Sequence, residues 1–339
     1  MLKKQNKHFT TISDVANYAK VGKTSVSRYL NGEQDKLSEE LREKIAQAIA
    51  DLDYRPSHSA RMLRAGHSKL IGLLLADVTN PYSIDVLKGI EHVCRREGYM
   101  LMVCNTDNKE DLQDSYLSLL QAHRVDGIIV NTTGMAQKQI NSLQQLSCPL
   151  VLVDRIDTSL GFDTVGLDNE AAAKEACEHL QAHAYESILV VTESVSIEPR
   201  QARVNTIQTF AKENHLTCQV VEIEKMSLDR LIQAIKDFIA SQPNRKKAIF
   251  TTNGIAMMST AKALKQLDIQ VGSELGLIGI DDPEWAQLFE GGITVMRQPT
   301  QLIGQTACER LLARVQGNNE PAQHLKLKAE LIQRHSLTR

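Results

Sequence analysis

Apolar residues in the first 52 positions recur at the three- to four-residue spacing of α-helices. Each of three groups shares one helical face: Ile12, Val15, Ala16 and Ala19; Val26, Tyr29 and Leu30; and Leu41, Ile45, Ala48, Ile49 and Leu52. Thr11 or Ser13 can cap the first helix, and Ser38, followed by two glutamates, can cap the third. The pattern predicts a small bundle of three helices.

Residues 53–68, with the sequence DYRPSHSARMLRAGHS, break this pattern. Pro56 suits the first position of a helix, but the stretch that ends at Leu63 covers only about two turns. A helix of that length is not stable alone in water, so we expect it to become ordered against a partner.

After Ser68, short apolar runs that are typical of β-strands alternate with amphipathic helical stretches. The strand-like runs are 70–76, 100–104, 127–130, 150–154, 187–191, 218–223, 248–252 and 275–280, and the helical stretches include 83–97, 110–123, 169–182, 200–214, 227–240 and 254–267. This alternation predicts parallel sheets covered on both faces, and so many strands suit two lobes better than one. The predicted fold is multi-domain: an all-α head and a two-lobed α/β core that binds ligands in its cleft.

Charge is distributed unevenly along the chain. The 339 residues carry a net charge of −2, yet residues 1–66 hold 12 Lys and Arg against 8 Asp and Glu, whereas the rest hold 27 against 33. A basic head on an acidic body predicts that the head meets a polyanion and the body does not.

The six cysteines form no C-x-x-C pair and lie among apolar residues, so we expect reduced thiols and neither a metal site nor a cofactor. Residues 1–10 are polar, and the apolar run at 70–78 is too short to span a bilayer. These features predict a cytoplasmic protein with no membrane partner.

The stretch VGKTSVSRYL at 21–30 contains Gly22-Lys23-Thr24, which imitates the end of a phosphate-binding loop. Such a loop needs another glycine five positions earlier, where this chain has Asn17, and a strand before it, where this chain has a polar segment. The ATPase interpretation is therefore rejected, and the alternative is a helix that reads DNA.

With its flanks, this region resembles the LacI/GalR family of bacterial transcription regulators. The matching residues of the head and junction are Asp14-Val15-Ala16, Val21, Val26-Ser27-Arg28, Leu30-Asn31, Leu41-Arg42-x-Lys44-Ile45, Tyr54-x-Pro56 and Ala60-x-x-Leu63. Those of the body are Asn80-Pro81-Tyr82, Val125-Asp126-Gly127-Ile128-Ile129, Asp154-Arg155, Gly279-x-Asp281-Asp282 and Gln298-Pro299. The resemblance covers nearly the whole chain. It implies a DNA-binding repressor of carbohydrate or sugar-acid catabolism genes under allosteric control by a small effector, and not an enzyme.

The resemblance also implies domain limits. They are 1–55 for the helix-turn-helix domain, 56–68 for the hinge helix and linker, and 69–339 for the effector-binding and dimerisation core. Within the core, the N-lobe is expected at about 69–166 and 299–323, and the C-lobe at about 167–298 and 324–339.

In a helix-turn-helix, the second helix enters the major groove by its N-terminal end. Lys23, Thr24 and Arg28 would then face bases, and Ser25, Ser27 and Asn31 would reach phosphates. The alternatives are an exposed helix surface that reads nothing, or for Arg28 an ion pair with Glu39 or Glu40. The chain departs from the family pattern at two positions, with Lys20 for the turn glycine and Gly22 for the serine that opens the helix.

The junction matches the family's hinge helix, in which two copies are expected to fold together in the minor groove. Ala60 would lie on the groove floor, Leu63 would wedge between base pairs, and Ser57, His58 and Arg61 would lie near phosphates. This geometry implies a homodimer on a pseudo-palindromic double-stranded operator, because both partners share one two-fold axis. The alternative is an ordinary linker whose Leu63 packs on the body.

For the effector site, the resemblance implies Tyr82, Ser83, Asp154, Arg155, Arg200, Arg203, Asn253, Asp281 and Trp285. Carboxylate, amide and guanidinium groups suit bidentate bonds to sugar hydroxyls. Three arginines in an acidic body indicate an anionic effector of the 2-ketogluconate or 2-keto-3-deoxygluconate type. A neutral sugar, or a nucleoside or purine, stays open as the alternative. Arg155 and Arg200 could instead pair with Asp157 or Glu198, and Trp285 could be a core residue.

Two other classes of protein would use the same body. An enzyme could use Asp281 and Asp282 as an acid and a base, but the chain shows no nucleophile elbow and no glycine fingerprint after a strand. A sugar-binding transport receptor would share the body but not the head, so residues 11–63 exclude both.

Overall fold

The computed structural model describes residues 10–55, 67–131, 137–154, 160–223 and 227–337. These residues form two compact units, residues 1–68 and 69–339, which are described separately below.

The first unit contains three α-helices, as the spacing of apolar residues predicts. They are α1 (Ile12–Tyr18), α2 (Lys23–Leu30) and α3 (Glu39–Asp51), and a short 3-10 helix, η1 (Gln34–Lys36), precedes α3. Thr11 caps α1 in a reciprocal capping box with Asp14, and Ser38 caps α3. Predicted apolar positions form one core, with Val15, Ala16, Val26, Ile45 and Ala48 all buried.

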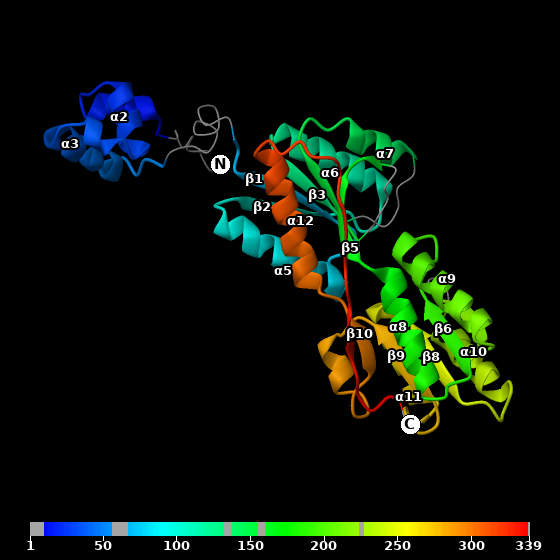
Figure 1. The fold of residues 1–339 in the computed structure, drawn as a ribbon. Helices are drawn as coiled ribbons and strands as arrows, with labels where there is room; N and C mark the ends of the chain where they lie inside the picture. Colours follow the sequence, from blue (N-terminus) through cyan, green and yellow to red (C-terminus); the bar gives the residue numbers. More distant parts are fainter. Residues whose placement is uncertain (1–9, 56–66, 132–136, 155–159, 224–226, 338–339) are drawn as a thin grey trace, which may run out of the picture. The chain divides into compact units, whose positions relative to one another are not determined.

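The first lobe of the second unit is built on a six-stranded parallel sheet in the order β11-β5-β4-β3-β1-β2. The strands are β1 (Leu70–Leu75), β2 (Met100–Asn105), β3 (Gly127–Val130), β4 (Leu150–Val153), β5 (Asp163–Leu167) and β11 (His324–Leu327). On one face, α5 (Pro81–Arg96) and α12 (Thr300–Val315) pack side by side (Figure 1). On the other face lie α6 (Glu110–Ala122) and α7 (Gln137–Gln144).

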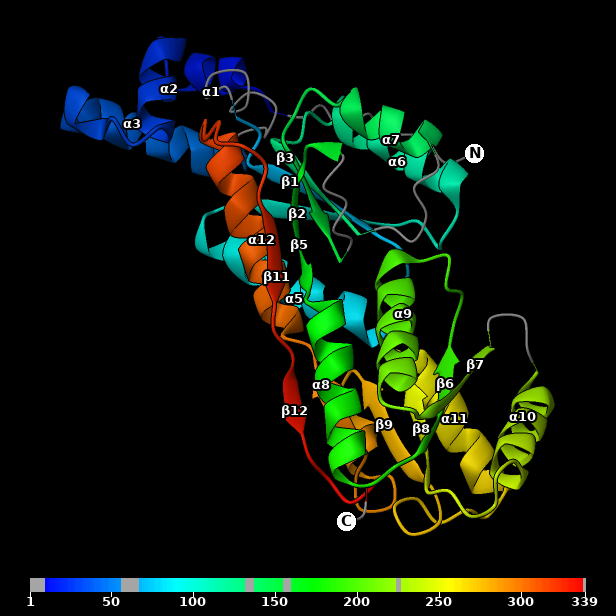
Figure 2. The same cartoon turned by 45° about the vertical axis from the view of Figure 1, so that its right-hand side comes forward.

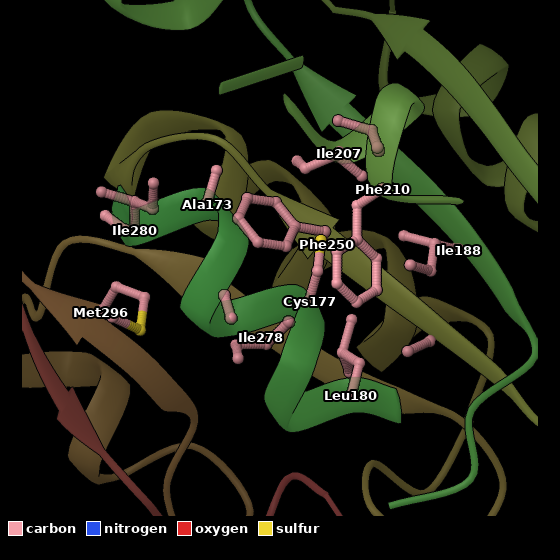
Figure 3. Packing of buried hydrophobic residues seen from close by; sticks show 14 of the residues in the cluster. Ala173, Cys177, Leu180, Ile188, Ile207, Phe210, Phe250, Ile278, Ile280 and Met296 are labelled. Atoms are coloured by element: carbon pink, nitrogen blue, oxygen red, sulfur yellow. The ribbon is translucent and has the colours of Figure 1, made fainter. Parts of the chain in front are cut away.

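The second lobe repeats this plan with the sheet order β12-β10-β9-β8-β6-β7. Its strands are β6 (Ser187–Thr192), β7 (Thr217–Glu222), β8 (Lys247–Thr251), β9 (Gly276–Ile280), β10 (Thr294–Arg297) and β12 (Glu330–Ile332), and β12 alone is antiparallel to its neighbour. The covering helices are α8 (Asn169–Ala182), α9 (Glu198–Glu213), α10 (Leu228–Ala240) and α11 (Gly254–Gln266), with a short 3-10 helix, η3 (Glu284–Gln287), after β9. Helices α8 and α9 lie side by side on one face (Figure 2), and Figure 3 shows the packing beneath them around Phe210 and Phe250.

The chain crosses between the two lobes three times, after β5, after β10 and after β11. The last crossing corrects a predicted limit: residues 324–327 belong to the first lobe, because β11 pairs in parallel with β5 from Thr164 to Leu167. The second lobe therefore resumes only after Leu327. The sheets are parallel as predicted, except that β12, at the edge of the second sheet, pairs antiparallel with β10.

Within the described residues, no helix is both long enough and apolar enough to cross a membrane.

Candidate DNA-binding head and effector cleft

The turn between α1 and α2 contains Lys20 and Gly22, the two residues at which the chain departs from the family pattern. Lys20 lies in the left-handed region with φ 54°, where a side chain is strained and glycine is favoured. Gly22 takes the N-cap position of α2 with φ −72° and ψ 145°, and it offers no side chain to cap the helix. The turn is thus formed by two residues that stabilise it less than the usual pair would.

Helix α2 buries Val26 against the bundle and presents its polar residues outward. Of the predicted DNA-binding residues of the head, Lys23, Thr24, Arg28 and Asn31 are exposed, and Ser25 and Ser27 are half-buried. The amide of Asn31 donates a hydrogen bond to the Ser27 hydroxyl at 3.4 Å. Together they make a polar surface along α2, from its first turn at Lys23 to its C-cap at Asn31.

The alternative ion pair of Arg28 is not found. Glu40 pairs with Lys44 at 2.7 Å instead, and among the described residues no ion pair involves Arg28. The predicted hinge residues Ser57, His58, Ala60, Arg61 and Leu63 lie outside the described residues, so their roles stay predictions.

In the second unit, two aspartates end equivalent strands of the two lobes. Asp154 follows β4 and Asp281 follows β9, and both have left-handed backbone angles, with φ 76° and 83°. Each donates its amide to the next strand, Asp154 to the Val165 carbonyl at 2.9 Å and Asp281 to the Met296 carbonyl at 3.1 Å. Both carboxylates therefore stand at the strand ends where parallel sheets bind ligands.

A cavity of about 90 Å³ lies between these strand ends and draws on both lobes. Seven of the predicted effector residues line it: Tyr82, Ser83, Asp154, Arg200, Arg203, Asn253 and Asp281. The predicted Arg155 lies outside the described residues. The structure therefore brings together side chains that are far apart in the sequence, and we call this cavity the effector cleft.

Trp285 lies elsewhere. It lines a second cavity, of about 440 Å³, together with Met258, Lys262 and Pro283. The two cavities share five lining residues: Asn80, Tyr82, Ile255, Asp281 and Gln298. Trp285 is thus a neighbour of the effector cleft and does not line it, because it belongs to η3, beyond the strand end that holds Asp281.

The polar groups of the cleft are held by the protein itself. Arg203 is only 3% exposed and donates to the Asn169 side-chain oxygen at 2.8 Å and to the Thr252 carbonyl at 2.6 Å. Asp281 accepts hydrogen bonds from the Gly254 amide at 2.8 Å and from the Gln298 side chain at 2.6 Å. These bonds fix the groups before a ligand arrives.

The Tyr82 hydroxyl is buried near the Asp154 carboxylate and makes no hydrogen bond of normal geometry to a described residue. Burial, and next the charge of Asp154, raises the pKa of Tyr82 well above its usual value. The hydroxyl is therefore neutral and available to a ligand. A buried polar group without a partner is costly, which makes it a marker of a binding site.

One residue of the cleft was missed from the sequence. Glu193 follows β6 directly, and its Oε2 accepts hydrogen bonds from Arg200 at 2.6 Å and from the Asn253 side chain at 2.6 Å. Arg200 thus pairs with Glu193, and not with Glu198 as the alternative expected. The available signal was an acid at the carboxyl end of the apolar run SILVVT.

The expectation of a basic cleft is not met by the described lining. Four carboxylates line the effector cleft against two guanidinium groups: Asp77, Asp154, Glu193 and Asp281 against Arg200 and Arg203. What distinguishes the site is the position of each charge and not an excess of positive charge.

The six cysteines are free, and Cys94 and Cys308 meet at 3.6 Å between α5 and α12. Among the described residues, no group of three or more His, Cys, Asp or Glu side chains is placed to hold a metal ion.

Each of the two structural units matches a known family of protein domains. Residues 11–57 match the model of the bacterial regulatory proteins of the lacI family, and residues 68–335 match that of periplasmic binding proteins and the sugar-binding domain of the LacI family. The chain belongs to the LacI family of bacterial regulatory proteins.

Relatives within the LacI family match this chain over nearly its whole length. It is 40% identical to the HTH-type transcriptional regulator PtxS of Pseudomonas aeruginosa over 96% of this chain and 95% of the relative. It is 38% identical to the HTH-type transcriptional regulator KdgR of Bacillus subtilis over 99% and 100%. Among solved structures, the lac repressor dimer bound to operator and the anti-inducer ONPF matches 97% of this chain and 99% of its own with a TM-score of 0.85 at 23% identity, which is a likeness of fold.

Proposed function

We propose that this LacI-family regulator is a transcriptional repressor whose affinity for its operator is set by a small molecule in the effector cleft. The observation that carries the proposal is the pair Asp154 and Asp281, two carboxylates at equivalent strand ends of two lobes that face one cavity. A ligand that bonds to both carboxylates links the two lobes and can therefore favour one arrangement of them over another. The chain is proposed to act through binding alone, as a regulator of DNA in the bacterial cytoplasm, and not as an enzyme.

In this proposal, α2 reads the operator. Lys23, Thr24 and Arg28 are exposed and can therefore reach base edges. Lys23 and Arg28 can donate hydrogen bonds to guanine, and the Thr24 methyl group can contact the thymine methyl group. Ser25, Ser27 and Asn31 position the helix on phosphates.

We further propose a homodimer. A lac repressor dimer on operator DNA shares the fold of this chain, and the symmetry of a dimer requires a pseudo-palindromic operator. The hinge residues Ser57, His58, Ala60, Arg61 and Leu63 are proposed to meet the minor groove at the operator centre, with Leu63 as the wedge.

The effector is proposed to be a sugar acid of the 2-ketogluconate or 2-keto-3-deoxygluconate type. Asp154 and Asp281 can hold hydroxyl groups, and the Tyr82 hydroxyl supplies one more partner. Arg200 already holds a carboxylate, which supports an acidic group at that position. The surplus of carboxylates favours a neutral sugar as the second candidate, since carboxylates are good acceptors for hydroxyls.

The coupling between effector and operator is proposed to run through the three crossings between the lobes. A bound effector changes the angle between the lobes, which changes the distance between the hinge helices of the dimer. Operator affinity would then shift by about 1–3 kcal/mol.

A thermal-shift screen of sugars, sugar acids and purines tests the effector. We expect 2-ketogluconate or 2-keto-3-deoxygluconate to raise the Tm of the wild-type chain and to have a much smaller effect on Asp281→Asn, which loses a ligand carboxylate. Stabilisation by a neutral sugar and by no sugar acid would contradict the proposed effector.

A further inference from the structure

Glu193 places a carboxylate inside the effector cleft. Its Oε2 accepts one hydrogen bond from Arg200 Nη2 and another from Asn253 Nδ2, each at 2.6 Å. The side chains of Glu193 and Arg200 are only 17% and 14% exposed, so this ion pair is largely shielded from water. Two donors from different elements thus converge on a single carboxylate oxygen.

These donors differ from the other polar groups of the cleft. Arg203 is bound to Asn169 and to the Thr252 carbonyl, neither of which lines the effector cleft. Asn253 uses its side-chain oxygen to cap α11 through the Ala256 amide, which leaves its NH2 group for Glu193. Arg200 and the Asn253 amide therefore form an anion-binding position that the Glu193 side chain now fills.

We propose that Glu193 is a resident carboxylate that occupies the anion position of the cleft, and that the carboxylate of an acidic effector displaces it. The inference rests on the proposed function and adds the residue that selects for charge. The exchange replaces one carboxylate by another on the same two donors, so the charge of the pair is conserved. A neutral sugar cannot make this exchange, because it would leave Arg200 without a counter-charge in a shielded site.

The position is formed before the lobes respond to a ligand. Glu193 follows β6, Arg200 lies in the first turn of α9, and Asn253 precedes α11, and all three elements belong to the second lobe. Glu193 thus acts as an internal competitor that lowers the affinity for every acidic ligand and rejects those that bind through the carboxylate alone. Effector hydroxyls must supply the remaining free energy through the other groups of the cleft.

The first test uses acetate as the probe and needs no effector. Glu193→Ala removes the resident carboxylate and leaves a space beside Arg200. We expect millimolar acetate to raise the Tm of full-length Glu193→Ala, and to leave the wild type, Glu198→Ala and the double variant Glu193→Ala/Arg200→Ala unchanged. An equal response of all four proteins, or none in Glu193→Ala, overturns the inference.

The second test uses calorimetry with 2-ketogluconate and glucose on the isosteric variant Glu193→Gln, which keeps the shape of the site. We expect 2-ketogluconate to bind about tenfold more tightly than to the wild type, and glucose affinity to change less than about twofold. Weaker binding of 2-ketogluconate would overturn the inference, because Glu193 would then be a direct ligand of the effector. If acetate stabilises Glu193→Ala but no sugar acid binds, the anion position occupied by Glu193 is supported and the proposed effector is refuted instead.

Discussion

Gly89 of α5 and Gly304 of α12 lie at one crossing of these helices, each against the backbone of the other. A Cβ atom on Gly89 would collide with the Gln301 carbonyl, and one on Gly304 would collide with the Val86 carbonyl. Backbone atoms cannot move aside as a side-chain end can, so both positions require glycine. This close contact with α5 holds α12 in the first lobe (Figure 1). Helix α12 is the first element after the chain leaves β10 of the second lobe.

The first prediction concerns this crossing. Gly89→Ala and Gly304→Ala should each lower the free energy of unfolding of the core by about 2–3 kcal/mol, because the added methyl group forces the helices apart. Urea denaturation followed by circular dichroism measures the loss. Lys88→Ala, next to Gly89 but exposed, should change stability by less than about 0.5 kcal/mol. Equal effects of Gly89→Ala and Lys88→Ala would contradict the close crossing.

A second prediction concerns Asp163, a buried carboxylate at the start of β5. It accepts hydrogen bonds from Arg314 at 2.7 and 3.0 Å, from Arg310 at 3.1 Å and from the Gln323 amide at 2.7 Å. Asp163→Asn should cost about 3–5 kcal/mol of unfolding free energy, because it leaves two largely shielded guanidinium groups without their counter-charge. In Asp85→Asn, which alters an exposed pair with Lys88, the loss should stay below about 1 kcal/mol.

The same carboxylate predicts a pH dependence. Burial alone would raise the pKa of Asp163, but the bonds from Arg314, the Gln323 amide and Arg310 hold it below its usual value. A depressed folded pKa means that the stabilisation is present above the unfolded pKa and is lost as pH falls through the folded value. Between pH 5 and 2 the wild type should therefore lose more stability than Asp163→Asn. A parallel loss in both proteins would show that Asp163 does not carry this dependence.

Sequence reasoning reached the head helices and most central strands, because their apolar patterns are local. It missed β5, β10, β11 and β12, which have only three to five residues and therefore carry too little pattern. At the site, the family resemblance placed Asp154 and Asp281, and both follow apolar runs that are typical of strands. Trp285 could not be placed, since its distance from the cleft depends on the course of a loop and a single 3-10 turn.

A third prediction concerns the unusual turn of the head. Lys20→Gly should raise the free energy of unfolding of the head by about 1 kcal/mol, since glycine takes the left-handed conformation without strain. Thermal unfolding of the full chain, monitored through the head tyrosines, measures the change. Lys44→Gly, in the middle of α3, should have the opposite sign and lose about 1 kcal/mol. A destabilised Lys20→Gly protein would contradict the strain at Lys20.

A fourth prediction separates reading of bases from binding of phosphates. Arg28→Ala should weaken binding to the chain's selected operator by about 1–3 kcal/mol and change binding to unrelated duplex DNA much less, because the guanidinium group bonds to a base edge. Fluorescence anisotropy at fixed salt measures both affinities. The control variant is Lys44→Ala, which removes an exposed cation on α3, outside the helix that is proposed to read bases. Equal losses on both DNAs would assign Arg28 to the phosphate backbone.

The central claim is that occupation of the effector cleft controls binding of the head to DNA. The most direct measurement selects an operator from a randomised duplex library with the full-length chain, and then titrates the selected DNA with and without saturating 2-ketogluconate. We expect a pseudo-palindromic operator and a change in Kd of about 5- to 150-fold, which is lost in Asp281→Asn. An asymmetric selected site, or a Kd that saturating sugar acid leaves unchanged, would contradict it.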